Sequence, residues 1–315
     1  MNISLEKITD ILKSKNYFYI LTHQYPDGDT LGSAYALCIA LQKMGKKAKV
    51  LSDKHPEKYD ILKTGVKEES FEPDYIIIVD VADAQILAYS LKKFSDKIDL
   101  SIDHHALGQP FAKFQYIEPD SAATAEIIYK IIKMLGIEID KNIATCIYTG
   151  ISTDTGCFKY ANATPRSYRI AADMLEVGID AKNINRIMFD TKTRSRLEIE
   201  RMVLDNIEFY FNSRCAIIYV TLDMIKKAHA NDADLESLAS IPRQIEGVLV
   251  GITMRQKDDG SFKVSIRTDD NIDSAKICKK LGGGGHQCAA GCSIKADLNS
   301  AKEALICAVK EFIGK

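Results

Sequence analysis

The 315-residue chain has almost no excess of charge of either sign. Its 42 Lys and Arg residues are balanced by 43 Asp and Glu residues, for a formal net charge of −1. Proteins that grip long nucleic acid by charge alone carry a strong basic excess or a basic stripe. We therefore expect no long duplex nucleic acid among the partners, whereas a small anionic substrate held at one local site remains open.

Paired cysteines and long apolar runs are also missing. The 8 cysteines include no CxxC pair, and most lie inside apolar segments, as Cys38, Cys146 and Cys307 do. This is typical of reduced, buried thiols in a cytosolic protein. No apolar run approaches the roughly 20 residues of a membrane span, and the N-terminus MNISLEKITDILKSK lacks the apolar core of a signal peptide. We expect a cytoplasmic protein without a membrane partner.

What the chain does have is a regular alternation of strand-like and helix-like segments. Its 46% hydrophobic content suffices for a sizeable core, and its length favours two domains. The continuous β-branched run 75–79 is typical of a parallel strand that is covered on both faces. The predicted elements of the first half are strands at 17–22, 47–51, 75–79 and 97–102 and a helix at 31–44. This rhythm predicts a doubly wound, mainly parallel α/β domain.

The second half begins with helical patterns from about residue 122 and then becomes α/β again. Residues 191–209 are charged, contain no Gly or Pro, and are interpreted as a helical connector. Strands are predicted at 215–220, 247–256 and 262–268, with Gly260 in a hairpin turn. We expect one α/β domain at 1–190, the connector at 191–209, and a smaller glycine-rich α/β domain at 210–315.

Ionisable residues follow three strands of the first domain at the point where each strand ends. The first strand leads into His23, Asp27 and Asp29, the strand at 75–79 into Asp80, and the strand ending near 102 into Asp103-His104-His105. Ligands of an open parallel sheet bind beyond the carboxyl ends of its strands. Asp154 is a fourth candidate, because a helical apolar stretch breaks just after it, at Gly156.

Carboxylates and imidazoles together suit Mn²⁺, Mg²⁺ or Fe²⁺ better than a thiolate zinc site does. So many acids in one crevice would repel one another without cations between them, which favours two metal ions over one. Taken singly, Asp27 and Asp29 could be turn and helix-cap residues, and a His-His pair is more often a surface feature than a ligand pair. Their shared position at one sheet edge favours the metal site.

A second cluster lies near the C-terminus, in the run LGGGGHQCAAGC at 281–292. Successive glycines let the backbone approach an anion and can expose several N–H groups to it. Arg267, in the preceding strand, can make a bidentate phosphate contact. Phosphate or nucleotide binding is therefore preferred over a merely flexible turn. A zinc site of His286, Cys288 and Cys292 is disfavoured, because no fourth ligand lies nearby.

These motifs closely resemble those of the DHH phosphoesterase superfamily, over nearly the whole chain. The resembling segments are HQYPDGDTLGSA (23–34), VDVAD (79–83), SIDHHALG (101–108), STDTGCFKY (152–160) and GGGGHQCAAGC (282–292). Their order and approximate spacing agree with the family. The chain looks most like the stand-alone two-domain type, the bifunctional oligoribonuclease and 3′-phosphoadenosine-5′-phosphate (pAp) phosphatase type. Family II pyrophosphatases lack the glycine run, and RecJ-like exonucleases carry further domains.

The resemblance implies a role for each of these residues. His23 and Asp27 would hold one metal, Asp29, His104 and Asp154 the other, and Asp80 would bridge both. His105 would contact the scissile phosphate and could assist the leaving group, and Asp103 would orient a ligand histidine. The substrate's terminal phosphate or nucleotide would be bound in the second domain by Arg267, Gly283, Gly284, Gly285 and His286. The cofactors would be two divalent cations, Mn²⁺ before Mg²⁺, Co²⁺ or Fe²⁺.

The implied reaction is hydrolysis of short oligoribonucleotides, two to five nucleotides long, to mononucleotides and of pAp to AMP, by a hydroxide that bridges two metals. Hydrolysis of cyclic di-AMP or of its linear product pApA is an alternative that the sequence leaves open. A nucleotide sensor without turnover is disfavoured, since all six implied ligands are present. We further expect a monomer or homodimer, and the connector to let the second domain close over the site.

Overall fold

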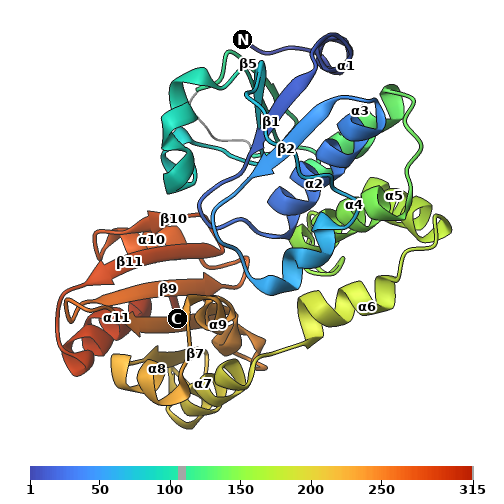
Figure 1. Ribbon diagram of the computed structural model, residues 1–315. Coiled ribbons are helices and arrows are strands. Elements are labelled where there is room, and N and C mark those ends of the chain that lie inside the picture. Colours follow the sequence, from blue (N-terminus) through green and yellow to red (C-terminus); the bar gives the residue numbers. More distant parts are fainter. Residues whose placement is uncertain (106–110, 314–315) are drawn as a thin grey trace. The chain divides into compact units, whose positions relative to one another are not determined.

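A computed structural model describes residues 1–105 and 111–313, with only the backbone described at Glu236 and Ser237. The chain divides into two compact units, Met1–Thr191 and Lys192–Lys315, hereafter the first and second units (Figure 1). Among the described residues, no helix is long and apolar enough to cross a membrane.

The first unit is built on a five-stranded sheet in which every neighbouring pair is parallel. Its strands, in the spatial order β2-β1-β3-β4-β5, are β1 (Tyr17–Leu21), β2 (Lys47–Leu51), β3 (Tyr75–Val79), β4 (Leu100–Asp103) and β5 (Phe114–Ile117). Strand β3 is buried at all five residues, as its β-branched run predicts. Strand β1 lies between β2 and β3, the two strands that follow it in the chain, so the strand order reverses at β1. The carboxyl ends of β1, β3 and β4 are adjacent at one edge of the sheet, where ligands of such sheets bind.

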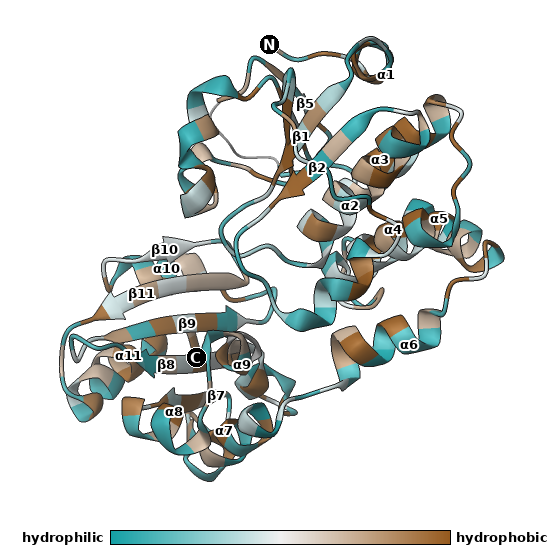
Figure 2. Ribbon diagram, in the orientation of Figure 1, coloured by the Kyte–Doolittle hydropathy of each residue, from teal (hydrophilic) through white to brown (hydrophobic). Residues whose placement is uncertain are grey.

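Both faces of this sheet are covered. One face packs against a large apolar core contributed mainly by helices, and Figure 1 shows α2, α3 and α4 gathered on that side. The other face is covered by short 3₁₀ segments, Ala84–Ile86 and Tyr89–Lys97, through residues such as Leu87 and Leu91. The helices of the unit are α1 (Leu5–Ser14), α2 (Gly28–Lys43), α3 (Thr124–Met134), α4 (Lys141–Asp154), α5 (Pro165–Glu176) and α6 (Ala181–Asn185). Figure 2 shows the centre of the sheet as predominantly hydrophobic.

The predicted fold class is confirmed, with several differences in the elements. Strand β4 begins at Leu100 rather than at residue 97, because the preceding residues form the 3₁₀ segment Tyr89–Lys97. Helix α2 begins three residues earlier than expected, at Gly28, because Asp27 caps it. Strand β5 was not predicted, since its four half-exposed residues FQYI show no buried run. A further 3₁₀ segment, Glu57–Lys63, and a π-helical turn, Arg186–Asp190, complete the unit.

The second unit contains a six-stranded mixed sheet. Its spatial order is β10-β11-β9-β8-β7-β6, and only the β7–β8 pair is parallel. The strands are β6 (Glu208–Tyr210), β7 (Cys215–Val220), β8 (Val250–Gln256), β9 (Phe262–Thr268), β10 (Gly284–Gly285) and β11 (Ala289–Ile294). Of these, β7, β8 and β9 were predicted, and Gly260 lies in the turn between β8 and β9 with φ of +80°.

The helices of the second unit lie on both faces of its sheet. They are α7 (Arg194–Asp205), α8 (Leu222–Ala228), α9 (Asp232–Leu235), α10 (Ser274–Lys279) and α11 (Leu298–Ile313), with a 3₁₀ segment at Glu236–Gln244. One face packs against α10 and α11 through residues such as Ile277 and Leu305. Helix α7, which falls in the stretch interpreted as a connector, buries Ile199 and Val203 against the opposite face. Its action as a connector stays a prediction.

Candidate metal centre

The loop after β1 places two aspartates at the start of α2. Asp27 caps this helix, because its Oδ1 accepts hydrogen bonds from the backbone N–H of Asp29 and of Thr30, each at 3.0 Å. The cap therefore uses one carboxylate oxygen of Asp27 and leaves the other free. Asp29 is only 1% exposed and accepts from the backbone N–H of Thr124 at 2.6 Å and of Ala125 at 2.9 Å. It thereby ties the start of α2 to the start of α3.

Asp80 follows β3 directly, at the same edge of the sheet. Its backbone has a φ of +60°, in the left-handed region that non-glycine residues rarely adopt, and its side chain is buried. The Thr30 hydroxyl lies 2.6 Å from Oδ2, and the Thr124 hydroxyl donates to Oδ1 at 3.0 Å. The unusual backbone and these hydroxyls hold the carboxylate at the sheet edge instead of letting it turn towards solvent.

His104, directly after β4, points one ring nitrogen at three acids. Its Nδ1 lies 3.1 Å from the carbonyl oxygen of Ser121, an acceptor only, so Nδ1 carries the proton. The lone pair is then on Nε2, which lies 3.6 Å from Asp80 Oδ1, 3.6 Å from Asp154 Oδ2 and 4.0 Å from Asp29 Oδ2. A histidine whose second nitrogen is fixed by a backbone carbonyl is the usual form of a metal ligand.

Asp103 and His105 form a separate pair beside this nitrogen. Asp103 is buried, and its Oδ1 accepts from Nδ1 of His105 at 2.7 Å and from the His105 backbone N–H at 3.1 Å. The hydrogen bond to Asp103 raises the pKa of His105 to about 9. The ring is half exposed, and its Nε2 is turned away from the buried partner. Residues 106–108 of the SIDHHALG segment lie outside the described residues.

His23 completes the group from the end of β1. The Tyr25 N–H lies 3.3 Å from His23 Nδ1, and the Thr30 hydroxyl lies 2.6 Å from Nε2. Because Nδ1 accepts from Tyr25, the ring proton lies on Nε2 and is donated to Thr30, whose own hydroxyl proton goes to Asp80. This chain of hydrogen bonds links His23 to Asp80, which in turn lies 3.6 Å from His104 Nε2.

The predicted ligands come together as two groups, and a third group of Asp80, Asp103, His104 and His105 shares one residue with each of them. Ligand atoms of His23, Asp27 and Asp80 lie within 4.8 Å of one another, and so do those of Asp29, His104 and Asp154. Burial raises the pKa of Asp29 well above its usual range, and the neighbouring charges of Asp80 and Asp154 raise it further. Burial likewise raises the pKa of Asp80, and it raises that of Asp154 to about 6. Such crowding of buried acids is the electrostatic environment that a divalent cation relieves.

Several residues that sequence reasoning missed hold these acids in place. Thr30 and Thr124 contact Asp80 as described above. Helices α2 and α4 approach closely at Gly32 and Gly150, where a Cβ at Gly32 would meet the Cys146 carbonyl oxygen at 2.5 Å and one at Gly150 would meet Asp29 Oδ1 at 2.9 Å. This approach brings Asp154, the last residue of α4, to the same edge as Asp29. The glycines inside two apolar helical patterns were the available signal.

The glycine run of the second unit is a tight hairpin instead of an open anion loop. The N–H groups of Gly282, Gly283 and His286 are engaged with the carbonyls of Lys279, Cys278 and Ala289. The expectation that successive N–H groups are free is therefore wrong for these three, because they close the end of α10 and the β10–β11 turn. A Cβ at Gly283 or Gly285 would clash with β11 at 2.2 Å and 2.5 Å, so close packing explains both glycines.

The remaining predicted residues of the second unit lie around this hairpin. At Gly284 an added Cβ would meet nothing within 4 Å. Arg267 lies on β9 opposite Ala289 of β11, and His286 is exposed at the hairpin turn. Cys292 is buried, and none of the three-residue ligand groups found among the described residues includes Cys288, Cys292 or His286. This is consistent with the low preference given to a zinc site there.

Comparison with known proteins matches one family domain to each of the two units. The profile of the DHH family, N-terminal domain, matches residues 17–151, and that of the DHHA1 domain matches residues 213–315. The bifunctional oligoribonuclease and PAP phosphatase NrnA of Thermus thermophilus is 33% identical over 96% of this chain and 93% of its own. The protein of the same name from Bacillus subtilis is 23% identical over 88% of this chain and 90% of its own.

Solved structures agree with this assignment. An exopolyphosphatase-related protein from Bacteroides fragilis is 26% identical, covers 98% of this chain and 96% of its own, and superposes with a TM-score of 0.86. RecJ of Thermus thermophilus in complex with Mn²⁺ shares the fold alone, at 13% identity and a TM-score of 0.56, over 98% of this chain and 54% of its own. The chain belongs to the DHH family and, with its DHHA1 domain, is a two-domain hydrolase of phosphoester bonds.

Proposed function

We propose that this protein is a divalent-metal-dependent phosphoesterase that hydrolyses short oligoribonucleotides to mononucleotides and pAp to AMP. The observation that carries the proposal is a pair of ligand groups, His23, Asp27 and Asp80 beside Asp29, His104 and Asp154, joined by the 3.6 Å approach of His104 Nε2 to Asp80 Oδ1. Relatives named as oligoribonuclease and PAP phosphatase, similar over nearly the full length, support the substrate class. Two divalent ions, Mn²⁺ first, suit a set of carboxylates and imidazoles without thiolates.

In this proposal each residue has a distinct task. His23 and Asp27 would hold one ion, Asp29, His104 and Asp154 would hold the other, and Asp80, which groups with His23 and Asp27 and lies 3.6 Å from His104 Nε2, would serve both. When bound, the ions supply positive charge that lowers the pKa of a water molecule from 15.7 towards about 7 and offsets the charge of the phosphoryl oxygens. His105, fixed by Asp103, would present Nε2 to a phosphate oxygen or to the leaving group.

The two units would divide the work. We propose that residues 1–190 carry the chemistry, that 210–315 bind the substrate's distal phosphate through Arg267, Gly283 to Gly285 and His286, and that 191–209 connect them. Arg267 is suited to phosphate because its guanidinium carries a permanent charge and, among the described residues, has no acidic partner. The tight hairpin of Gly284 and Gly285 would let a substrate lie close to the backbone.

The experiment that tests the proposal is a panel of initial rates with added Mn²⁺. The substrates are a 5′-phosphorylated RNA dinucleotide, pAp, a 24-mer RNA, cyclic di-AMP and pyrophosphate, each repeated with EDTA in place of the metal. Fast release from the dinucleotide and pAp, with the others slow, is the expected result. Preference for cyclic di-AMP would reassign the substrate and keep the site. Turnover that persists undiminished in EDTA would overturn the metal dependence.

A further inference from the structure

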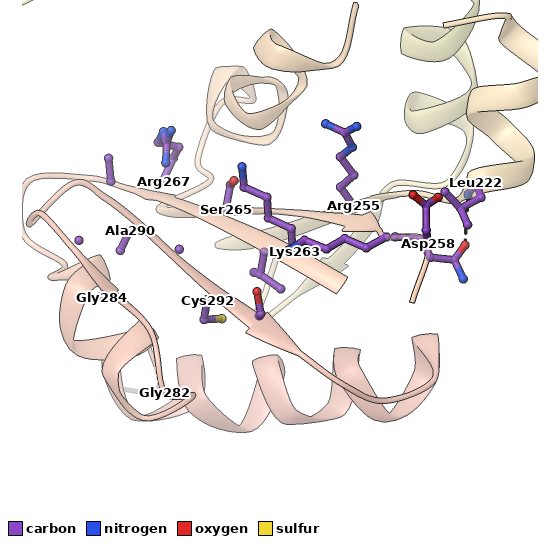
Figure 3. Close-up of a pocket in the computed structure, with 17 residues that line it drawn as sticks. Leu222, Arg255, Asp258, Lys263, Ser265, Arg267, Gly282, Gly284, Ala290 and Cys292 are labelled. Atoms are coloured by element: carbon purple, nitrogen blue, oxygen red, sulfur yellow. Dashed lines mark hydrogen bonds between the residues drawn. The ribbon is translucent and has the colours of Figure 1, made fainter. Parts of the chain in front are cut away.

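One half of a face of the second-unit sheet is left bare by the helices. Towards β7, this face is covered by α7, α8 and the segment after α9, which pack on Ile218 and Val220. Towards β9, β10 and β11, the same face lines a hollow of about 1000 Å³ (Figure 3). The opposite face of these strands is buried against α10 and α11. The hollow therefore has the sheet itself as its floor.

The register of the strands shows how this floor is built. Side chains alternate along β9, so Lys263, Ser265 and Arg267 point to the bare face while Val264 and Ile266 are buried. Ser265 pairs with Gly291 of β11, which pairs with Gly284 of β10. The middle of the floor is thus a row of residues with little or no side chain. Long cationic side chains stand on both sides of it, Arg267 on one and Lys263 on the other.

Lys263 also faces a second cation. In the β8–β9 ladder it is the direct partner of Arg255, and like charges at opposed positions of an antiparallel pair are destabilising. Arg255 has a counter-charge in Asp232, which is 83% exposed. Among the described residues, neither Lys263 nor Arg267 is paired with an acid, and Asp258 is the one carboxylate that lines the hollow. An anion between Lys263 and Arg255 would relieve their repulsion.

The two cationic ends of the groove are set apart along β9. Lys263 and Arg267 are four residues apart on one strand, which corresponds to about 13 Å along β9. Figure 3 shows Arg267, Lys263 and Arg255 projecting from the same side of the sheet, away from the helix beneath it. None of the described residues that line the hollow is aromatic, so they offer no platform on which a base could stack. Recognition here would depend on phosphate charge and not on base identity.

We propose that this groove binds two backbone phosphates of a single-stranded oligonucleotide, with Lys263 and Arg255 forming a second phosphate site next to the one at Arg267. The proposal rests on the proposed function and deepens it, because the number of phosphates bound by the second unit would depend on the length of the substrate. A 5′-phosphorylated dinucleotide has one phosphate left when its internal phosphodiester is at the metal centre. A trinucleotide has two, and only it can use both sites.

The test compares KM for 5′-phosphorylated di- and trinucleotides in the Mn²⁺-loaded full chain. Wild type is expected to show a KM about five- to ten-fold lower for the trinucleotide, as one charge-assisted contact provides. In Lys263→Glu this advantage disappears, and the dependence of the trinucleotide's affinity on salt becomes weaker by about 0.7 in its log–log slope. The new carboxylate faces Arg255, so the unfolding midpoint is expected not to fall. That separates lost binding from lost stability.

The matched control is Lys310→Glu, an exposed position on α11, on the other side of the sheet, with the same change in net charge. It is expected to keep the length preference. Equal KM values for the two oligonucleotides in wild type, or a preference that survives in Lys263→Glu or is lost equally in Lys310→Glu, would overturn the second phosphate site. These outcomes all require metal-dependent turnover of the dinucleotide. If that turnover is absent, it is the proposed function that fails.

Discussion

Asp80 combines three properties that a mobile surface acid would not have. It is buried, it occupies a left-handed backbone conformation with φ of +60°, and two threonine hydroxyls fix its oxygens. Burial of the charge and the left-handed backbone both cost folding free energy, whereas the threonine hydrogen bonds offset part of that cost. The raised pKa of Asp80, which burial causes, expresses the same cost as a preference for the neutral form. A buried acid of this kind, in a cluster of acids, marks a functional position.

Asp80→Asn should therefore remove function without unfolding the protein. Asparagine tolerates the left-handed conformation and retains the size of the side chain, but it cannot bridge two cations. We expect turnover of the dinucleotide to fall about 1000-fold and the Mn²⁺ content after dialysis to fall with it. The unfolding midpoint in EDTA should not decrease, because one buried charge is gone. Asp10→Asn, at an exposed position of α1, is the control. Near-normal turnover in Asp80→Asn would show that the bridging role is wrong.

Glu118, after β5, gives the first unit a measurable acid sensitivity. Burial opposes its charge, but hydrogen bonds from Lys130, Tyr116 and Ser121 outweigh it and lower the pKa of Glu118 to about 2. Arg166 adds an ion pair at 2.9 Å. A carboxyl group whose pKa is lower in the folded chain stabilises the fold above its unfolded pKa, and loses that effect as the pH falls through the folded value.

The prediction concerns how the effect of Glu118→Gln changes with pH. We expect the variant to have a lower unfolding midpoint than wild type near neutral pH. The gap should narrow as the pH falls from about 4.5 towards 2, since wild type then loses the same charge. Denaturation curves in EDTA, at pH 7, 4 and 2.5, measure it. A gap that stays constant over this range would mean that the side chain acts by packing and not by charge.

At the scale of whole elements, the site depends on the close approach of α2 and α4. Gly32 and Gly150 leave no room for a Cβ, since the atoms that one would meet belong to Cys146, Ala125 and Asp29. This contact between the helices positions a candidate metal ligand. It brings the last residue of α4, Asp154, into one group with Asp29 at the start of α2 and with His104.

Gly150→Ala tests this contact. A methyl group would lie 2.6 Å from the Cβ of Ala125 and 2.9 Å from Oδ1 of Asp29, so α4 must move away from α2. Overpacking of this kind costs about 1–3 kcal/mol. We expect a lower unfolding midpoint together with weaker Mn²⁺ binding, measured by titration calorimetry. The double variant Gly150→Ala/Ala125→Gly removes the contact between methyl groups and should recover part of the loss. Unchanged metal affinity in the single variant would dissociate the helix contact from the site.

Site residues that follow directly after a strand could be predicted from the sequence. The placement of those that depend on the packing of distant elements could not. The ends of β1, β3 and β4 were predictable, because buried β-branched runs lead directly into His23, Asp80 and His104. Strand β5 was missed, because its side chains are half exposed and alternate weakly. That Asp154 lies beside Asp29 depends on two glycines more than 100 residues apart, which a local pattern cannot connect. Here the family resemblance supplied what periodicity could not.

For the glycine run, the sequence suggested an open anion-binding loop that the structure does not form. Its composition suggested a flexible backbone with free N–H groups, whereas the structure uses Gly283 and Gly285 to seat one strand against another. Pairing with β11 is a long-range property, so the sequence pattern alone could not separate an anion loop from a tight hairpin. The same pairing produces the row of small residues that forms the floor of the groove. The glycines thus matter to binding through the surface they create.

At the scale of the whole molecule, the two units have separate cores. Among the described residues, the buried members of the two apolar clusters of the first unit extend to Met188, and those of the two clusters of the second unit begin at Ile199. All the candidate metal ligands lie in the first unit, and the basic groove lies in the second. Two units with independent cores can unfold in separate transitions.

This arrangement predicts that Mn²⁺ stabilises one unit and leaves the other unchanged. A ligand at 100 times its Kd stabilises the unit that binds it by about 2.7 kcal/mol. Calorimetric scans of the full chain should therefore show one transition moving upward with Mn²⁺ and one that stays in place. A 5′-phosphorylated trinucleotide added in EDTA should move the second transition instead, and Lys263→Glu should reduce that shift. If both transitions move together with metal alone, the units are energetically coupled, and the division of labour between metal centre and groove does not hold.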